Sequence, residues 1–344
     1  MAITLVTGGN GFIGQHLVAG LLAQDRRVRI LDIRTPARML PDAQYLEGSV
    51  LDAGTVREAL RDVDKVYHLA GLPGMWMPDK TAFHEVNCRG TEIVLAEARR
   101  RGVERFLHCS TESILFHPSA GAREAEEEDV LLPAEAMPGA YTRSKALAEH
   151  NALEAAAAGF PVVIGTPTMP VGAHDQGLTP PAAMLRHFLD RRLQFYLDFT
   201  VNLAAVPDVA AGLILAMERG TVGHRYVLGG EILRLRQILQ MIAEFSERRN
   251  ILIPVPAKIA EVAAATIEMF SDHVTRRQPS GTGEGVRIAL RGTELSSAKA
   301  RRELGFAPRP VGPALLATLN SLRDAGPDRV PFGPRQGSFR VPAE

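Results

Sequence analysis

The eight residues from Thr7 to Gly14, TGGNGFIG, constrain the fold more than any other feature of this chain. Residues 3–7 before them have the pattern of a buried strand, and residues 12–23 have that of an amphipathic helix. Gly8 permits a tight turn, Gly11 lets the backbone approach a phosphate, and Gly14 lets the helix pack closely on the strand. Because N–H groups at a helix start attract anions, this order predicts a dinucleotide-binding turn.

Strand and helix patterns then alternate through the first half of the chain, which predicts βαβ units and a parallel sheet. We expect a doubly wound Rossmann α/β fold over residues 1–170, with about 200–230 also contributing to it. Beyond about residue 170 the alternation weakens, and residues 171–326 are expected to form mainly a smaller substrate-binding lobe. The Pro-, Gly- and Arg-rich residues 327–344 are expected to form a flexible tail. The expected strands are 3–7, 28–33, 44–47, 65–69, 105–110, 162–164 and 226–228, and the expected helices 53–60, 82–101, 140–158, 205–217, 235–246 and 296–304.

Charge and cysteine content argue against several classes of partner. The chain has 39 Lys and Arg and 39 Asp and Glu, with no basic stripe, so we expect no nucleic-acid partner. Two cysteines cannot make a disulfide framework or a multi-cysteine zinc site, and His68, His84 and His108 lack a ligand spacing, so no metal is expected. No run of about 18 apolar residues and no secretory leader pattern occur, so we expect a cytoplasmic protein without a transmembrane segment.

Tyr141 and Lys145 place a phenol and an ammonium one helical turn apart on one face of the expected helix. A free tyrosine has a pKa of about 10. The ammonium, reinforced by a cationic nicotinamide ring, would stabilise the phenolate and lower that pKa. Ser110 and Thr111 end the fifth expected strand, at the edge of the sheet where ligands bind in open α/β folds. We therefore predict a Tyr-Lys proton-transfer pair, with a hydroxyl from Ser110 or Thr111 holding the substrate oxygen opposite Tyr141.

Asp32 ends the second expected strand and favours NAD as the cofactor. A carboxylate at this position accepts hydrogen bonds from the ribose hydroxyls and repels a 2′-phosphate. Arg34 and Arg38 follow closely and are able to clamp such a phosphate instead, which leaves NADP open.

These motifs resemble the extended short-chain dehydrogenase/reductase superfamily, also known as the NAD-dependent epimerase/dehydratase family. The similarity is closest to its hopanoid-associated sugar epimerase, dihydroflavonol reductase and 3β-hydroxysteroid dehydrogenase branches. It extends over nearly the whole chain. The motifs are TGGNGFIG, HLAG ending at Gly71, VNCRGT starting at Val86, CST starting at Cys109, YTRSK starting at Tyr141, PTMPVG starting at Pro167, VPD ending at Asp208, YVLGG starting at Tyr226 and SSAKARRELGFAPRP starting at Ser296.

The resemblance implies a role for each matching residue. Tyr141 would be the acid/base, Lys145 would bind the nicotinamide ribose, and Thr111 would be the catalytic hydroxyl, with Ser110 beside it. Asn87 would lie near the nicotinamide, and Pro167 would begin the segment beneath it. The complete set expected to contact the cofactor is Gly8, Asn10, Gly11, Phe12, Ile13, Gly14, Asp32, Arg34, Ser49, Val50, Leu69, Ala70, Gly71, Asn87, Cys109, Tyr141, Lys145, Pro167 and Thr168.

The sequence departs from the family pattern in two places. Gly48-Ser49 stands where Gly-Asp usually reads the adenine, so Ser49 or the Val50 backbone would make that contact. Nucleotide-sugar epimerases of the family offer an arginine and an asparagine to the sugar diphosphate, where this chain has Val201 or Asn202 and Met169. Arg186, Arg191 and Arg192 lie nearby in sequence and can substitute, but a basic helix end explains them equally well.

We therefore expect an NAD(P)-dependent dehydrogenase or reductase that acts on a hydroxyl or ketone of a largely apolar, steroid-, terpenoid- or flavonoid-like ring compound. The loop over the nicotinamide contains Met75, Trp76 and Met77, which suit an adaptable apolar wall. Thr111, Glu112 and Met169 complete the expected substrate site. The alternatives are a sugar epimerase, acting on a nucleotide- or lipid-linked sugar, and an NAD-sensing protein without turnover.

Two further expectations concern surfaces. The helices at 82–101 and 140–158 resemble those of the family's dimer interface, and Ala152, Ala155, Ala156, Ala157 and Ala158 permit close approach, so we expect a homodimer. The same alanines also suit packing on the chain's own sheet. The apolar segment 251–270 fits core best, with an apolar cleft or a membrane contact as alternatives.

Overall fold

The computed structural model describes residues 3–36, 39–115, 124–125, 133–247, 250–291 and 294–325, with only the backbone of 124–125. A seven-stranded parallel sheet forms its larger part, in the order β11-β7-β5-β4-β1-β2-β3. This is the predicted Rossmann arrangement. Its strands are β1 (Ile3–Thr7), β2 (Arg27–Asp32), β3 (Ala43–Glu47), β4 (Val63–His68), β5 (Arg105–Cys109), β7 (Val162–Pro167) and β11 (Arg225–Leu228).

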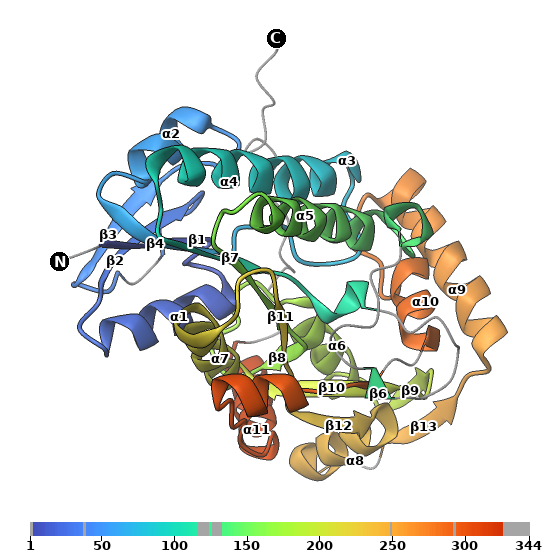
Figure 1. The fold of residues 1–344 in the computed structure, drawn as a ribbon. Helices are drawn as coiled ribbons and strands as arrows, with labels where there is room; N and C mark the ends of the chain where they lie inside the picture. The colour runs from blue at the N-terminus through green and yellow to red at the C-terminus, as the bar shows by residue number, and fades with distance from the viewer. Residues whose placement is uncertain are drawn as a thin grey trace.

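Helices cover both faces of this sheet (Figure 1). On one face α1 (Phe12–Leu22) and α7 (Val206–Arg219) bury one apolar core against the strands. On the other face α2 (Ala53–Ala59), α4 (Gly90–Arg101) and α5 (Ala140–Ala157) bury a second. The strands are apolar on both faces, because each lies between two layers of helices. α4 continues from the short α3 (Thr81–Phe83) through a π-helical turn at His84–Arg89, and it ends at Gly102 in the left-handed conformation.

The remaining elements form a smaller lobe beyond the carboxyl ends of the sheet strands. α6, α8 and α11 surround its core. Three small sheets complete it, in the orders β12-β10-β8, β13-β9 and β14-β6. The elements are β6 (Glu124–Ala125), β8 (Met169–Val171), α6 (Pro180–Leu189), β9 (Leu193–Tyr196), β10 (Thr200–Ala205), β12 (Glu231–Arg234), α8 (Leu235–Ser246), β13 (Ile251–Pro254), α9 (Ala257–Phe270), α10 (Gly283–Arg291), β14 (Glu294–Leu295) and α11 (Gly312–Asp324).

The interpretation of segment 251–270 as core is wrong. β13 and α9 occupy this segment, and Ala264 is the one residue of α9 that is buried. The segment is apolar because one face of α9 lines a cavity and another apolar face is exposed. Hydrophobicity alone therefore does not distinguish this segment from core. Within the described ranges, no helix combines the length and apolarity that crossing a membrane requires.

The alanines of α5 pack mainly within the chain itself. Ala152 is fully buried, and Ala155 and Ala156 pack against the same core. Ala157 and Ala158 are exposed. The homodimer stays a prediction, and the predicted tail at 327–344 lies outside the described residues.

Candidate active site

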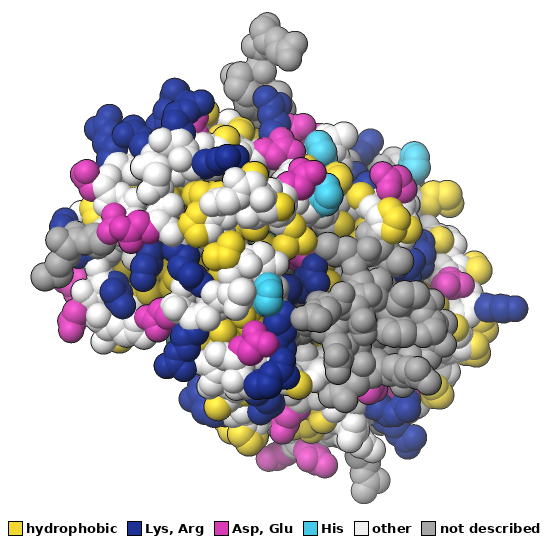
Figure 2. Space-filling view, viewed as in Figure 1, with side chains coloured by type: hydrophobic (Ala, Val, Ile, Leu, Met, Phe, Trp, Pro, Cys, Tyr) yellow, Lys and Arg dark blue, Asp and Glu magenta, His cyan; other side chains and the backbone are white. Residues whose placement is uncertain are grey.

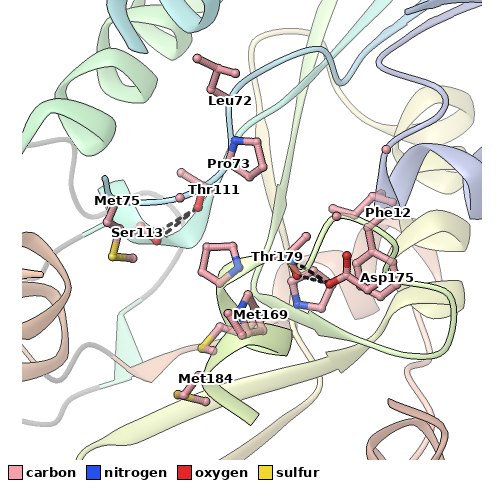
Figure 3. A pocket seen from close by; sticks show the side chains of 18 of the residues that line it. Phe12, Leu72, Pro73, Met75, Thr111, Ser113, Met169, Asp175, Thr179 and Met184 are labelled. Carbon is pink, nitrogen blue, oxygen red and sulfur yellow. Dashed lines mark hydrogen bonds between the residues drawn. The ribbon is translucent and has the colours of Figure 1, made fainter. Parts of the chain in front are cut away.

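A cavity of about 1750 Å³ lies between the carboxyl ends of the main sheet and the smaller lobe. Pockets that hold one drug-sized ligand measure about 300–1,000 Å³, so this cavity has room for a dinucleotide and a second molecule. The glycine turn lines one end of it, and residues of α6, β9 and α9 line the other. Figure 3 shows Phe12 and Thr111 on different walls, with Met169 and Met184 between and below them.

The glycine turn has the close approaches that its sequence predicts. Gly8 has a φ of +69°, and a Cβ there would lie 2.7 Å from the Ala70 backbone nitrogen. A Cβ on Gly14 would collide with the Gly8 carbonyl. The turn opens α1, whose first N–H groups lack partners within the helix and face the cavity end. The residues therefore fit a pyrophosphate, the part of NAD that such a turn binds.

Asp32 organises the loop that would hold the adenosine half. Its carboxylate accepts hydrogen bonds from the backbone N–H groups of Asn10, at 3.0 Å, and Arg34, at 3.2 Å. Burial raises the pKa of Asp32, while those hydrogen bonds lower it. Ser49, which replaces the family's aspartate, lines the cavity but accepts the N–H of Leu51 at 3.1 Å. Arg38, the other predicted clamp for a 2′-phosphate, lies outside the described residues.

His68 holds the loop that follows β4 through a chain of buried hydrogen bonds. Thr91 donates to the Asn87 carbonyl at 2.6 Å, so its oxygen accepts from His68 Nε2 at 3.0 Å. His68 Nδ1 therefore accepts the Thr7 hydroxyl at 2.8 Å, and that oxygen in turn accepts the Ala70 N–H at 3.2 Å. Burial and Lys145 lower the pKa of His68 to about 3, which keeps the ring neutral in this role.

Asn87 connects the same loop to the helix of Tyr141. Its Oδ1 accepts the Leu72 N–H at 2.7 Å, and its Nδ2 donates to Ser144 Oγ at 3.0 Å. Ser144 Oγ donates to the Tyr141 carbonyl at 2.7 Å. Asn87 is 2% exposed and does not line the cavity, so its observed contacts position the loop and α5.

Ser110, Thr111 and Tyr141 come together on the cavity wall, as predicted. Among the described residues, Ser110 Oγ is buried and finds no hydrogen-bond partner. Burial raises the pKa of Tyr141 to about 12, and a hydrogen bond with the Thr111 side chain lowers it in part. The lowered pKa expected from the sequence includes the charge of the nicotinamide ring beside the phenol as well as that of Lys145, and it stays a prediction for the protein with its cofactor. The phenol is protonated at neutral pH and available as a proton donor.

Lys145 lies behind this wall and not on the cavity surface. Its Nζ donates to the Cys109 carbonyl at 2.8 Å, and burial lowers its pKa. The ammonium is therefore held beneath the strand end that carries Ser110 and Thr111.

The start of α5 is capped by a residue from a distant part of the chain. Gly139 is the N-cap position and has no side chain to offer. Glu284 of α10 supplies a carboxylate in its place, accepting the Thr142 N–H and hydroxyl, both at 2.7 Å, and the Tyr141 N–H at 3.4 Å. A Cβ on Gly139 would collide with this carboxylate. No sequence signal pointed to Glu284, apart from a helix start that lacks its own cap.

Two of the three residues of the predicted apolar wall lie on the cavity surface. Met75 and Trp76 line the cavity, whereas Met77 does not and packs with Leu72 and Phe83 instead. Trp76 Nε1 also donates to Asp272 Oδ1 at 2.6 Å. Met169 lines the cavity as predicted, and Met184, which sequence reasoning missed, lies close to it (Figure 3).

Glu112 lines the cavity directly after Thr111, and burial raises its pKa to about 8. The carboxyl is therefore neutral below about pH 8 and charged above it. We expect the KM for an uncharged substrate to rise roughly threefold to tenfold between pH 7 and 9, about 0.7–1.4 kcal/mol of lost binding. Glu112→Gln, which is neutral throughout, is expected to remove this rise when KM is measured across that range.

Stability gives an independent check on Glu112. Its folded-state pKa lies above the free value of 4.5, so its contribution to stability is present at low pH and lost as pH rises through about 8. Glu112→Gln should therefore raise Tm relative to wild type at pH 9 and leave the difference small at pH 4. A wild-type KM that stays flat to pH 9 would contradict the assignment.

The predicted site residues fall into two groups, according to whether they line the cavity. Three lie off the cavity surface: Asn87, Lys145 and Met77. The remaining ones line it: Gly8, Asn10, Gly11, Phe12, Ile13, Gly14, Asp32, Arg34, Ser49, Val50, Leu69, Ala70, Gly71, Met75, Trp76, Cys109, Ser110, Thr111, Glu112, Tyr141, Pro167, Thr168 and Met169. In the part of the chain that the structure describes, no group of His, Cys, Asp and Glu is arranged to hold a metal ion.

The chain is similar to known proteins in sequence and in structure. The sequence model of the NAD dependent epimerase/dehydratase family matches residues 4–229. Sterol demethylase protein B of Methylococcus capsulatus is 30% identical, over 94% of this chain and 99% of that protein. The 4-hydroxy-2-methyl-3-oxo-4-farnesyl-3,4-dihydroquinoline-1-oxide ketoreductase of Stigmatella aurantiaca is 32% identical, over 94% and 96%. The crystal structure of gox2253 has a TM-score of 0.81 and 28% identity, covering 95% of this chain and 99% of that one.

Proposed function

The chain belongs to the NAD dependent epimerase/dehydratase family, and on that premise we propose that it reduces a ketone on a largely apolar ring compound, or oxidises the corresponding secondary alcohol. NAD supplies the chemistry of hydride transfer at the carbonyl carbon. The family membership supports an NAD-dependent enzyme. The substrate class and the roles of the residues below are our proposal.

In the direction of reduction, Tyr141 gives the proton that the carbonyl oxygen needs as hydride reaches the carbon. Thr111 and Ser110 donate hydrogen bonds to the same oxygen and orient it toward the phenol. Lys145, held under the strand end by the Cys109 carbonyl, stabilises the phenolate that remains. In the direction of oxidation the same groups act in reverse, and Tyr141 receives the proton.

The main support for this proposal is the apolar lining of the part of the cavity that lies beyond Thr111. Met75, Met169, Met184 and Phe188 line the cavity beyond Thr111. The position from which epimerases offer an arginine to a sugar diphosphate holds Val201 or Asn202, both buried and neither of them charged. Arg186 is turned away, donating to the Leu322 carbonyl at 2.9 Å. The two relatives named for sterol and farnesylated-ring chemistry support the same substrate class.

The experiment follows absorbance of NADH while the protein is mixed with 3-oxosteroids, terpenoid ketones, flavonoid ketones and UDP-sugars, with product isomers separated by chromatography. We expect saturable NADH consumption with at least one apolar ketone. Tight, saturable conversion of a UDP-sugar into its isomer, without net NADH change, would replace the proposal with the epimerase alternative.

Arg191 is the observation that favours this second candidate. It lines the cavity and is exposed, so it is placed to meet an anionic group. The family also includes epimerases by its own description.

Asp32 leads us to propose NAD in preference to NADP. We expect kcat/KM with NADH to exceed that with NADPH by about tenfold or more, because a carboxylate close to a phosphate costs more than about 1 kcal/mol even in water. Asp32→Asn keeps an acceptor for the Asn10 N–H and loses the charge, so it should bring the ratio close to one. A wild-type preference for NADPH would contradict this prediction.

We also propose a cytoplasmic homodimer, following the sequence resemblance of α4 and α5 to the family's dimer helices. Sedimentation velocity at micromolar concentration is expected to give the mass of two chains. A single species with the mass of one chain would refute it.

A further inference from the structure

β9 and β13 form a two-stranded sheet whose apolar side faces solvent. Leu193 pairs with Ile251, and Phe195 with Ile253. All four are exposed, with Phe195 at 60% and Ile251 at 62%, whereas Gln194, between Leu193 and Phe195 in β9, is buried. A half-solvated sheet normally turns its polar side chains outward. The reversal indicates that this side meets something other than water.

α9 continues the same exposed apolar surface. Ile259 is 59% exposed and Val262 68%, and Met269 and Phe270 follow at helical spacing. Another face of α9, with Ala260, Ala263, Ala264 and Ile267, lines the cavity. A helix that is apolar on both of these faces requires cover on both. We call the exposed set the outer patch: Leu193, Phe195, Ile251, Ile253, Ile259, Val262, Met269 and Phe270.

The outer patch borders the cavity mouth. Leu193 and Phe195 belong to the patch and also line the cavity. Figure 2 shows hydrophobic side chains along the right-hand edge of the molecule, where Figure 1 places α9. An apolar molecule that leaves a binding partner docked on this patch would therefore reach the cavity along apolar side chains.

Basic side chains flank the patch in sequence. Arg191 and Arg192 precede β9, Lys258 precedes Ile259, and Arg276 and Arg277 follow α9, all of them exposed. Four acidic residues near the patch are paired: Glu268 and Asp272 with Lys80, at 2.8 Å each, Asp190 with Arg186 at 3.9 Å, and Asp198 with Arg234 at 3.6 Å. Glu261 is exposed on α9. A twofold pairing of two such patches would bring like charges together, whereas an anionic lipid surface complements them.

We propose that the outer patch docks on a bilayer containing anionic lipid, so that an apolar ketone passes from the lipid into the cavity. The docking stands on the patch itself, and the passage of the ketone rests on the proposed function. Exposed apolar residues with basic neighbours are the features by which proteins lie on a membrane without spanning it.

Co-sedimentation of the full chain with vesicles, without NAD or substrate, tests the docking. We expect binding to vesicles of phosphatidylcholine and phosphatidylglycerol at about 3:1, weaker binding to phosphatidylcholine alone, and loss in about 0.5 M salt. The double variant Ile251→Glu/Val262→Glu should reduce the bound fraction about tenfold or more. Val222→Glu, a control at an exposed valine just before β11, should leave it unchanged.

Three outcomes would overturn the docking: no binding to either vesicle, equal loss in the Val222 control, or a wild-type dimer that the double variant converts to monomer. The last would assign the patch to a second copy. A second assay compares NADH oxidation with a sterol ketone carried in the vesicles and with a short water-soluble ketone. The double variant should lose the first rate and keep the second. Vesicle binding without turnover of any ketone would support the docking and overturn the proposed function.

Discussion

Tyr141→Phe is expected to lower kcat for ketone reduction by about 10²–10⁴-fold, the usual contribution of a positioned proton donor. The variant removes one oxygen atom from a side chain whose ring packs edge-on against Phe83, with ring centroids 5.9 Å apart. The fold and the cofactor site should therefore be retained. Steady-state NADH consumption gives kcat, and quenching of protein fluorescence by NADH gives its Kd, which should change little.

Tyr67→Phe is the matched control for this variant. Tyr67 is a buried tyrosine of β4 that does not line the cavity. Its loss of a hydroxyl should leave kcat within about twofold, as expected away from the reacting groups. If Tyr141→Phe retained wild-type turnover, another group would be the proton donor. If no substrate were turned over by either form while NADH still bound, the NAD-sensing alternative would gain support.

The features that could be predicted from sequence are those formed by neighbouring residues. The approach of Gly14 to the Gly8 carbonyl lies within the glycine turn itself, whereas the approach of Gly8 to Ala70 follows from the pairing of β1 with β4. Tyr141 and Lys145 share a helix face because they lie one helical turn apart. Ser110 and Thr111 lie on the cavity wall because parallel strands end at one edge of the sheet, which the alternating pattern predicts.

The features that were missed depend on contacts between distant segments. Glu284 caps a helix that starts 145 residues earlier, at Gly139, and nothing in its own neighbourhood distinguishes it from a surface glutamate. Segment 251–270 was expected in the core because composition does not show which face of a helix meets a cavity. Burial raises the pKa of Tyr141, and burial is likewise not visible in the YTRSK motif.

Glu284 joins the smaller lobe to the helix that carries Tyr141. α10 lies beneath the start of α5 in Figure 1, and Glu284 is 4% exposed there. Gly283, next to it, donates its N–H to Glu268 at 2.8 Å, and Glu268 binds Lys80 of the Trp76 loop. The cap is therefore one part of a connected set of contacts around the cavity, and its loss should disturb the position of Tyr141 as well as the helix start.

Glu284→Ala is expected to destabilise the protein by about 1–3 kcal/mol, because it removes a helix cap and charge-assisted hydrogen bonds. Tyr141 and Thr142 then lose the acceptor of their N–H groups, so the start of α5 and the Tyr141 phenol should shift. A small misplacement of a reacting group lowers the rate strongly, and kcat should fall about tenfold or more. Denaturant unfolding measures the first effect and NADH consumption the second. Glu261→Ala, an exposed glutamate on α9, is the control and should change neither.

Glu284→Gln separates a positioning role from a purely structural one. It keeps one oxygen acceptor for Thr142 but offers N–H groups toward Tyr141, so it should recover most of the stability and only part of kcat. The KM for the ketone should change less than kcat, because the cavity wall itself stays in place. A Glu284→Ala enzyme with normal kcat at a temperature where it is fully folded would show that α5 holds Tyr141 without the smaller lobe.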